Sequence, residues 1–322
     1  NQRRTRTLGL GAAVRSFNDL AVPGLGGVWF GKQLYLATLG VVVAERARRD
    51  GMRVQNIEVT NAVEALACWL ALQANGWTPD PRLRGARKMR QSTDLSFAHV
   101  RRRNFYVTQP MRQATVQPLR ALGLAESSGE RFNAFFSTSV GKDFVDTAGA
   151  DFAPYYSRSV LEHVTRWVTG DHDKVYSLTE ALSPLEPLSL RAREIVRERL
   201  AQGPAFEATR REAAIRWVSD LREKAPEHVE WNVKPPMLDE SHWRDLHAGA
   251  LFFSTRDAAI GVLDHVEAHI GNQGDEQRLS LKGPMPAAIS QQIGAVRASA
   301  KTTRSFSGQD GERLLLGVHQ YQ

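Results

Sequence analysis

A dense group of basic side chains is the feature of this sequence with the clearest chemistry. Between residues 82 and 103 the only acid is Asp94. Most of the bases are arginines, and a guanidinium can hold a phosphate through two hydrogen bonds at once. The stretch therefore predicts contact with a polyanion, with a solvated surface loop as the alternative. Its basic members are Arg82, Arg84, Arg87, Lys88, Arg90, Arg101, Arg102 and Arg103.

Other reactive side chains do not assemble into a recognisable active site. His265 and His269 flank Glu267 at helical spacing, but the order His-Val-Glu-Ala-His is not that of a zinc protease, and no third ligand is indicated. We therefore predict no catalytic residue, no metal and no cofactor, and we favour a protein that is not an enzyme. A metal-dependent nuclease built from scattered acids is a weaker alternative, and its candidate residues are Asp143, Asp146 and Asp151.

Charge is divided unevenly along the chain. The sequence has 42 Lys and Arg and 35 Asp and Glu, and residues 1–150 hold 21 of the bases but 11 of the acids. The first part therefore carries a net charge of +10 and the remainder a net charge of −3. This division suggests that one part contacts a polyanion, while the other contacts protein or solvent.

The environment of the chain is indicated by its one cysteine and its longest apolar run. Cys68 lies among Leu66, Trp69 and Leu70, which predicts a buried, inert thiol in a reducing cytoplasm. The apolar run from 34 to 44 is about half as long as a bilayer crossing requires. We therefore expect a cytoplasmic protein without a membrane partner.

The elements that must position these groups are mainly helical. We expect a basic arm with a Gly-rich loop over 1–32, a basic domain over 33–150, and a helical domain with a polar tail over 151–322. A wing strand is expected over Arg131–Thr138 and a last strand over Arg313–Val318. The expected helices are Gln33–Arg49, Ala62–Ala74, Gln109–Leu122, Ser159–Thr169, Leu190–Leu200, Arg210–Lys224, Glu240–Leu246 and Asp257–His269.

One run has a more specific pattern, which begins with Leu119-Arg120-Ala121-Leu122-Gly123-Leu124-Ala125-Glu126 and continues through Arg131 to Thr138-Ser139-Val140-Gly141. It resembles the end of a winged helix-turn-helix, as in the MarR-type regulators. In that family the recognition helix closes on a leucine and a Gly-Leu-x-Glu turn. A β-hairpin wing follows, and Thr-x-x-Gly begins the next helix.

The resemblance implies that residues 109–122 form the helix that enters the major groove, with Arg131 on the wing near a phosphate. Pro118 departs from the pattern because a proline kinks or shortens a helix. The long basic stretch before this helix is a second departure. Side chains suited to bases and phosphates are Gln109, Arg112, Gln113, Thr115, Gln117 and Arg120.

These observations predict a DNA-binding protein, with duplex DNA as the expected target. Its second half would bind a protein partner or another copy of the chain. The alternative is a structural or adaptor subunit of a bacterial multi-protein complex, such as one from a mobile element or a phage-defence locus. In that case the winged helix would bind protein, and salt would weaken the interaction much less.

Overall fold

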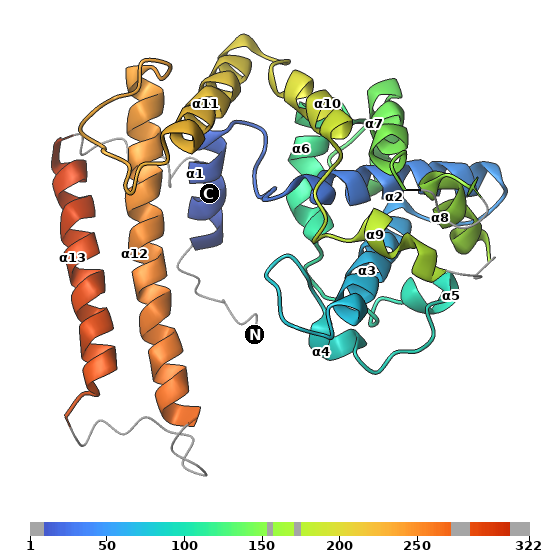
Figure 1. Ribbon diagram of the computed structural model, residues 1–322, viewed down its shortest axis with the longest axis horizontal. Coiled ribbons are helices and arrows are strands. Elements are labelled where there is room, and N and C mark those ends of the chain that lie inside the picture. The colour runs from blue at the N-terminus through green and yellow to red at the C-terminus, as the bar shows by residue number, and fades with distance from the viewer. Residues whose placement is uncertain (1–9, 153–156, 171–174, 272–283, 310–322) are drawn as a thin grey trace, which may run out of the picture. The chain divides into compact units, whose positions relative to one another are not determined.

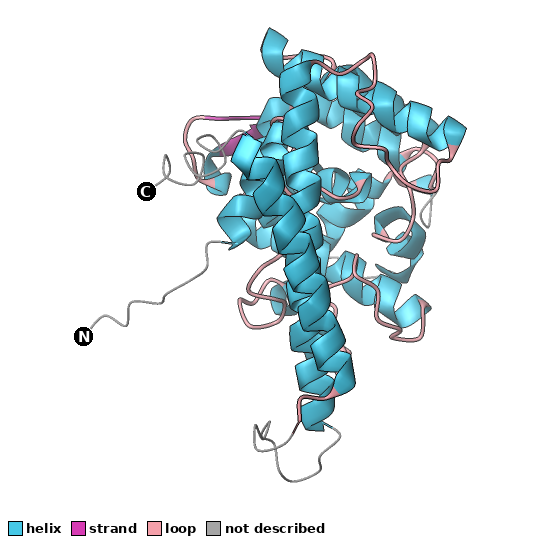
Figure 2. Ribbon diagram, turned by 90° about the vertical axis from the view of Figure 1, so that its left-hand side faces the viewer, coloured by secondary structure: helices cyan, strands magenta, loops and turns pink. Residues whose placement is uncertain are grey.

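The computed structural model describes residues 10–152, 157–170, 175–271 and 284–309. These residues are mainly helical, as expected, and their strands form one two-stranded sheet (Figure 2). The chain divides into two compact units. The central unit spans residues 23–212, and the terminal unit combines residues 1–22 with 213–322.

The central unit contains most of the short elements (Figure 1). Its α-helices are α2 (Gly31–Arg49), α3 (Asn56–Ala74), α4 (Ala86–Met89), α5 (Phe97–Val100), α6 (Val116–Ala121), α7 (Ser139–Gly149), α8 (Val160–Thr169), α9 (Thr179–Leu182) and α10 (Leu190–Leu200). Its 3₁₀ turns are η1 (Met111–Thr115), η2 (Phe132–Ala134) and η4 (Val175–Leu178), and its strands are β1 (Ala125–Ser127) and β2 (Phe135–Ser137). Helix α11 (Ala205–Lys224) runs across the division at residue 212.

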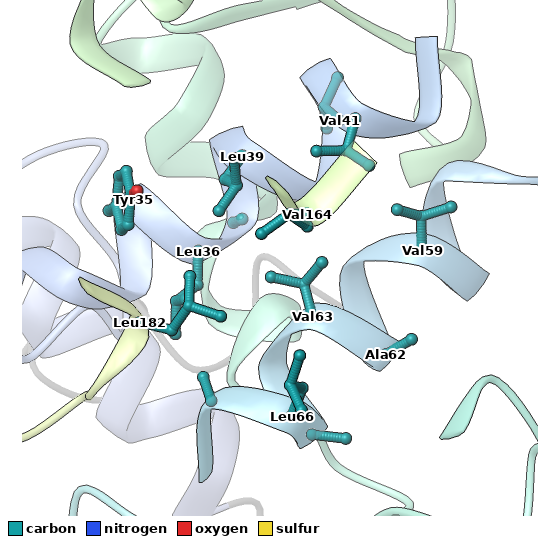
Figure 3. Close-up of a cluster of buried hydrophobic side chains, with 14 of the residues drawn as sticks. Tyr35, Leu36, Leu39, Val41, Val59, Ala62, Val63, Leu66, Val164 and Leu182 are labelled. Carbon is teal, nitrogen blue, oxygen red and sulfur yellow. The ribbon is translucent and has the colours of Figure 1, made fainter. Parts of the chain in front are cut away.

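Helix α2 is the centre of the central unit. Every residue from Lys32 to Ala44 is buried, because α3, α7, α8, β2 and η1 all pack against this helix. Figure 3 shows Leu36 and Leu39 of α2 beside Val63 of α3 and Val164 of α8. The apolar run that is too short for a bilayer is therefore the central core helix.

Helices α2 and α3 cross closely at Gly40. A Cβ atom at this position would lie 2.4 Å from Thr60 Oγ1 and 2.6 Å from Thr60 Cα. Only a residue without a side chain allows the two backbones to approach this closely. Helix α3 starts at Asn56, where Gln55 and Glu58 form its capping box, so it begins before the expected start at Ala62.

The β-hairpin lies between α6 and α7, and its register pairs Ala125 with Ser137 and Ser127 with Phe135. Strand β2 is shorter than the predicted strand 131–138 because residues 132–134 form a 3₁₀ turn. Asn56 at the start of α3 fixes this turn, since its Nδ2 donates to the Phe132 and Phe135 carbonyl oxygens at 3.2 and 2.7 Å. The hairpin is thus held against the core.

The Gly-Leu and Thr-x-x-Gly signals at this hairpin have direct physical causes. Gly123 takes the left-handed conformation with φ 63°, as its place after α6 predicts. Thr138 caps α7, because its Oγ1 accepts from the Gly141 amide at 2.9 Å and donates to the Gly123 carbonyl oxygen at 2.6 Å. A Cβ atom at Gly141 would lie 1.9 Å from the Leu124 carbonyl oxygen, so the helix start fits against the turn only with glycine there.

The terminal unit is built on α12 (Glu240–Gly271), against which α1 (Leu10–Ala21) and α13 (Ala287–Gln309) pack. Phe17 of α1 stacks on Phe252 of α12 with ring centroids 4.8 Å apart. A second small core joins three tryptophans, with Trp217 edge-on to Trp243 and Trp231 stacked on Trp243.

Several boundaries differ from the expected ones. The basic arm contains α1 from Leu10 onward, and the polar tail contains α13. One continuous helix, α12, stands in place of the two helices expected over 240–246 and 257–269. The two units divide at residue 212 rather than at residue 150, because α8 packs on α2 and so belongs to the central unit. The predicted strand 313–318 and residues 1–9 of the arm lie outside the described residues.

Candidate nucleic-acid interface

The basic stretch is a folded surface segment that follows α3. Its backbone is fastened to the core at two points, since Trp69 Nε1 donates to the Met89 carbonyl oxygen at 3.2 Å and Trp167 Nε1 donates to the Leu95 carbonyl oxygen at 2.8 Å. Met89 and Leu95 are buried, as is Phe97 on the one-turn helix α5. The segment therefore presents its basic side chains from a fixed backbone rather than from a freely solvated loop.

A buried polar network fixes the far end of the segment. Glu64 of α3 accepts hydrogen bonds from the Tyr106 hydroxyl at 2.9 Å and from the Met111 and Arg112 amides at 2.6 and 2.9 Å. Burial raises the pKa of Glu64 although these bonds favour the carboxylate. Cys68 lies 3.3 Å from the Tyr106 hydroxyl, and burial raises its pKa to about 12, as expected of an inert buried thiol.

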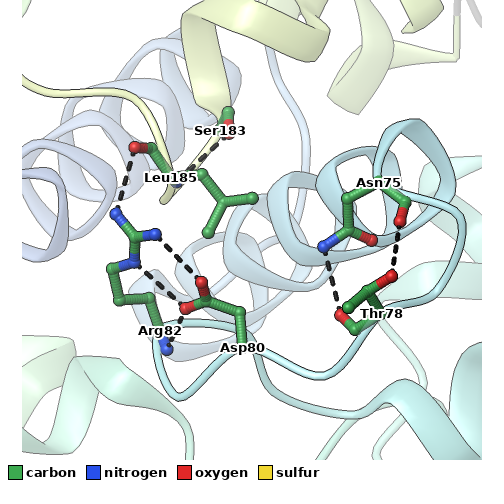
Figure 4. Close-up of polar contacts among 6 residues, drawn as sticks. All are labelled: Asn75, Thr78, Asp80, Arg82, Ser183 and Leu185. Atoms are coloured by element: carbon green, nitrogen blue, oxygen red, sulfur yellow. Dashed lines mark hydrogen bonds and ion pairs between the residues drawn. The ribbon is translucent and has the colours of Figure 1, made fainter.

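Three of the predicted arginines bind the protein itself. Arg82 forms an ion pair with Asp80 at 2.9 Å and donates to the Leu185 carbonyl oxygen at 3.2 Å (Figure 4). Arg84 donates to the Gln109 carbonyl oxygen. Arg101 pairs with Glu58 of α3 at 2.8 Å, and its guanidinium lies over the Phe97 ring. These arginines hold the segment in place.

The other five bases face solvent. Arg87, Lys88, Arg90, Arg102 and Arg103 are all exposed, and we call these five residues the arginine surface. Within the described part of the chain, Arg87, Arg90 and Arg103 make no hydrogen bond or ion pair through their side chains. Lys88 Nζ donates to the Tyr106 carbonyl oxygen at 2.6 Å, which ties α4 to the end of the segment. Guanidinium groups without a protein partner are free to bind phosphate.

The two parts of the segment meet at a hollow of about 410 Å³. Lys88, Gln91, Arg102 and Asn104 are among the residues that line it. Two members of the arginine surface, Lys88 and Arg102, therefore line a concave site. Sequence reasoning identified the cations but missed Gln91 and Asn104, because no spacing rule relates residues on two turns that meet only in the folded chain.

The predicted recognition helix has a different form from that expected. Residues 109–122 form η1 followed by the six-residue α6, and the helix is short because Pro118 cannot extend it in the amino-terminal direction. Arg112 is 8% exposed, and its Nε donates to Asn61 Oδ1 at 2.8 Å. Thr115 is fully buried, with its hydroxyl bonded to the Arg112 carbonyl oxygen. Neither side chain reaches the surface, so we exclude both from the candidate interface.

The remaining predicted side chains of this region are exposed. Arg131 lies at the hairpin turn, immediately before η2, and Arg120 lies over the Phe135 ring at 6.0 Å. Their exposure leaves them available to a partner, but no contact among the described residues joins them to the arginine surface. The exposed glutamines are Gln109, Gln113 and Gln117.

The groups considered for catalysis are dispersed. His265 on α12 contacts the Gly261 carbonyl oxygen of its own helix at 2.7 Å. Asp143 and Asp146 lie on α7, where burial is the main cause of a raised pKa for Asp146. Among the described residues, no group of three His, Cys, Asp or Glu side chains is placed to hold a metal ion. None of the described helices is both long enough and apolar enough to cross a bilayer.

Comparison with known proteins gives no match to a family model, to a curated protein or to a solved structure. The winged helix-turn-helix therefore stays a prediction from the sequence.

Proposed function

We propose that the central unit binds nucleic acid through the arginine surface. The proposal rests on the distribution of charged residues within the central unit. The unit has 26 Lys and Arg and 20 Asp and Glu, so its net charge is +6. Residues 82–103 contribute eight bases and one acid, which leaves the rest of the unit with 18 bases and 19 acids. The positive excess therefore belongs to one segment.

The pairing and exposure of the arginine side chains in this segment support the same function. Arg82 and Arg101 hold the segment in place through carboxylates of the protein. Arg87, Arg90 and Arg103 instead remain exposed without a partner among the described residues. Holding several like charges on one fixed segment is unfavourable unless an anion offsets their repulsion. The sugar-phosphate backbone supplies anions at a regular spacing.

The test is a titration of labelled duplex and single-stranded DNA across roughly 50 to 300 mM salt. If four arginines each neutralise one phosphate, the logarithm of the binding constant falls against the logarithm of salt with a slope of about −3.6 for duplex DNA. The test variant changes Arg87, Arg90, Arg102 and Arg103 to Gln. It leaves Arg101 unchanged, because that residue pairs with Glu58.

A matched control is available within the same unit. Arg191 and Arg193 are exposed on α10, and changing both to Gln removes surface charge away from the segment. We expect the control to keep its affinity for DNA. The variant with four Arg→Gln substitutions should lose most of its affinity and most of its salt dependence. Absence of binding at the lowest salt would refute the proposal. Binding that salt does not weaken would favour the adaptor alternative.

A further inference from the structure

The hollow lined by Lys88 and Arg102 has the size and chemistry of a site for a small anionic ligand. Its volume of about 410 Å³ falls in the range of small-molecule sites in proteins. The hollow is formed by the turn after α4 together with α5 and the residues that follow it. Both parts are fastened to the core by the hydrogen bonds from Trp69 and Trp167, so the site exists before any ligand binds.

Two cations line the hollow. Lys88 is held toward the segment by its bond to the Tyr106 carbonyl oxygen, and an ammonium group has two further protons to donate. Arg102 faces the hollow from the other part of the segment and is exposed. These two groups provide a place for a phosphate.

The acid in the hollow is largely engaged by the protein. Asp94 Oδ1 accepts from the Ser96 amide at 2.9 Å, and this bond is the main cause of the lowered pKa of Asp94. Its Oδ2 lies 3.5 Å from His99 Nδ1. These partners, together with the charge of Arg102, stabilise the carboxylate, and the hollow holds two cations, Lys88 and Arg102, against this one acid.

The remaining wall suits a nucleobase. Phe105 lines the hollow and is only 8% exposed, and its ring meets the His99 ring edge-on with centroids 5.3 Å apart. Asn104 and Gln91 supply amide groups that can both donate and accept hydrogen bonds. Aromatic rings together with amide groups are the means by which proteins bind unstacked bases.

We infer that this hollow takes one unpaired nucleotide of a DNA strand, with its phosphate toward Lys88 and Arg102 and its base toward Phe105, Gln91 and Asn104. A paired base cannot enter such a site, because it remains within the duplex stack. The inference rests on the proposed function and makes it more specific. The preferred ligand is duplex DNA with a single-stranded end, held along its backbone by the arginine surface.

The test compares a blunt duplex with the same duplex bearing a short single-stranded overhang, using fluorescence anisotropy. We expect the overhang to bind about tenfold tighter, which corresponds to about one to two hydrogen bonds from the base to the Gln91 and Asn104 amides. The double variant Gln91→Leu/Asn104→Leu should bind both duplexes with the affinity of the blunt one. The control Gln73→Leu, an exposed glutamine outside the hollow, should keep the preference. Matching thermal unfolding curves show that the variants are folded.

Failure of this inference differs from failure of the proposed function. Equal affinity for the two duplexes, or a preference that survives the double variant, overturns the nucleotide site while leaving the arginine surface intact. If neither duplex binds, the proposed function is refuted. A titration with dAMP then tests separately whether the hollow binds a nucleotide. Saturable dAMP binding that the double variant loses supports the site, and absence of dAMP binding to the unchanged protein overturns it.

Discussion

Lys32 gives the sharpest prediction about stability, because a buried ammonium group should make unfolding depend on pH in a narrow window. Its side chain is 2% exposed at the start of α2, and Nζ donates to the Ala181 carbonyl oxygen at 2.6 Å. Nζ also lies 5.1 Å from the Tyr35 ring centroid and 5.0 Å from that of Phe152. Burial lowers the pKa of Lys32 from 10.5 to about 8, although the charge of Glu186 opposes this.

The sign and size of the effect follow from the two pKa values. Between pH 8 and 10.5 the unfolded chain binds a proton at Lys32 that the folded chain has released, so the free energy of unfolding rises with pH in that window. Below pH 8 the folded protein bears the full cost of the buried charge, which is about 3 kcal/mol. The Lys32→Met variant removes that cost but also loses the bond to Ala181, which offsets about 1 to 2 kcal/mol.

We therefore expect Lys32→Met to be more stable than the unchanged protein at pH 7 by about 1 to 2 kcal/mol. Between pH 8 and 10.5 the difference in the free energy of unfolding between the two proteins should shift by about 3 kcal/mol in favour of the unchanged protein. Urea unfolding of the central unit measures both quantities. Comparing the two proteins cancels groups that they share, such as the Cys68 thiol. Lys142→Met, at an exposed lysine on α7, is the control and should show no such movement. A difference that stays constant from pH 7 to 10.5 would refute the reasoning.

Three further predictions concern the fold around the interface. Gly141→Ala should destabilise the central unit by more than about 2 kcal/mol in chemical denaturation, because its Cβ atom would lie 1.9 Å from a backbone oxygen that cannot move freely; an unchanged urea midpoint would contradict this. Thr138→Ala removes the cap of α7 and should cost about 1 kcal/mol in the same assay, with the exposed, non-capping Thr93→Ala as its control. Tyr106→Phe leaves Glu64 without one of its three donors and should cost about 1 to 3 kcal/mol. It should also raise the pKa of Glu64 further, which an NMR pH titration of that carboxyl group would detect, and an unshifted titration would show that the hydroxyl does not stabilise the carboxylate.

The sequence predicts those elements whose signals are local. Residues 190–200 form α10 with the expected bounds, because Ile195 and Val196 among charges of both signs form a local pattern that needs no distant contact to be recognised. The same holds for the left-handed Gly123 after α6. Helix α13 was not expected, because its large apolar residues are few and its stability depends on packing against α12. They are Ile289, Ile293, Val296 and Phe306. A helix that depends on tertiary packing shows only a weak hydrophobic pattern in its sequence.

The candidate interface shows the same division between local and long-range causes. The sequence by itself determined that eight bases and one acid lie within residues 82–103, because composition does not depend on folding. Only the tertiary structure decided which bases are available. Arg101 and Arg102 are neighbours in the chain, yet Arg101 meets Glu58 on α3 and Arg102 faces the hollow. Arg112 is withdrawn into the protein by Asn61, which lies 51 residues earlier. Whether an arginine holds the fold or faces a ligand depends on partners distant in sequence, and these are brought near only when the core around α2 and α3 forms.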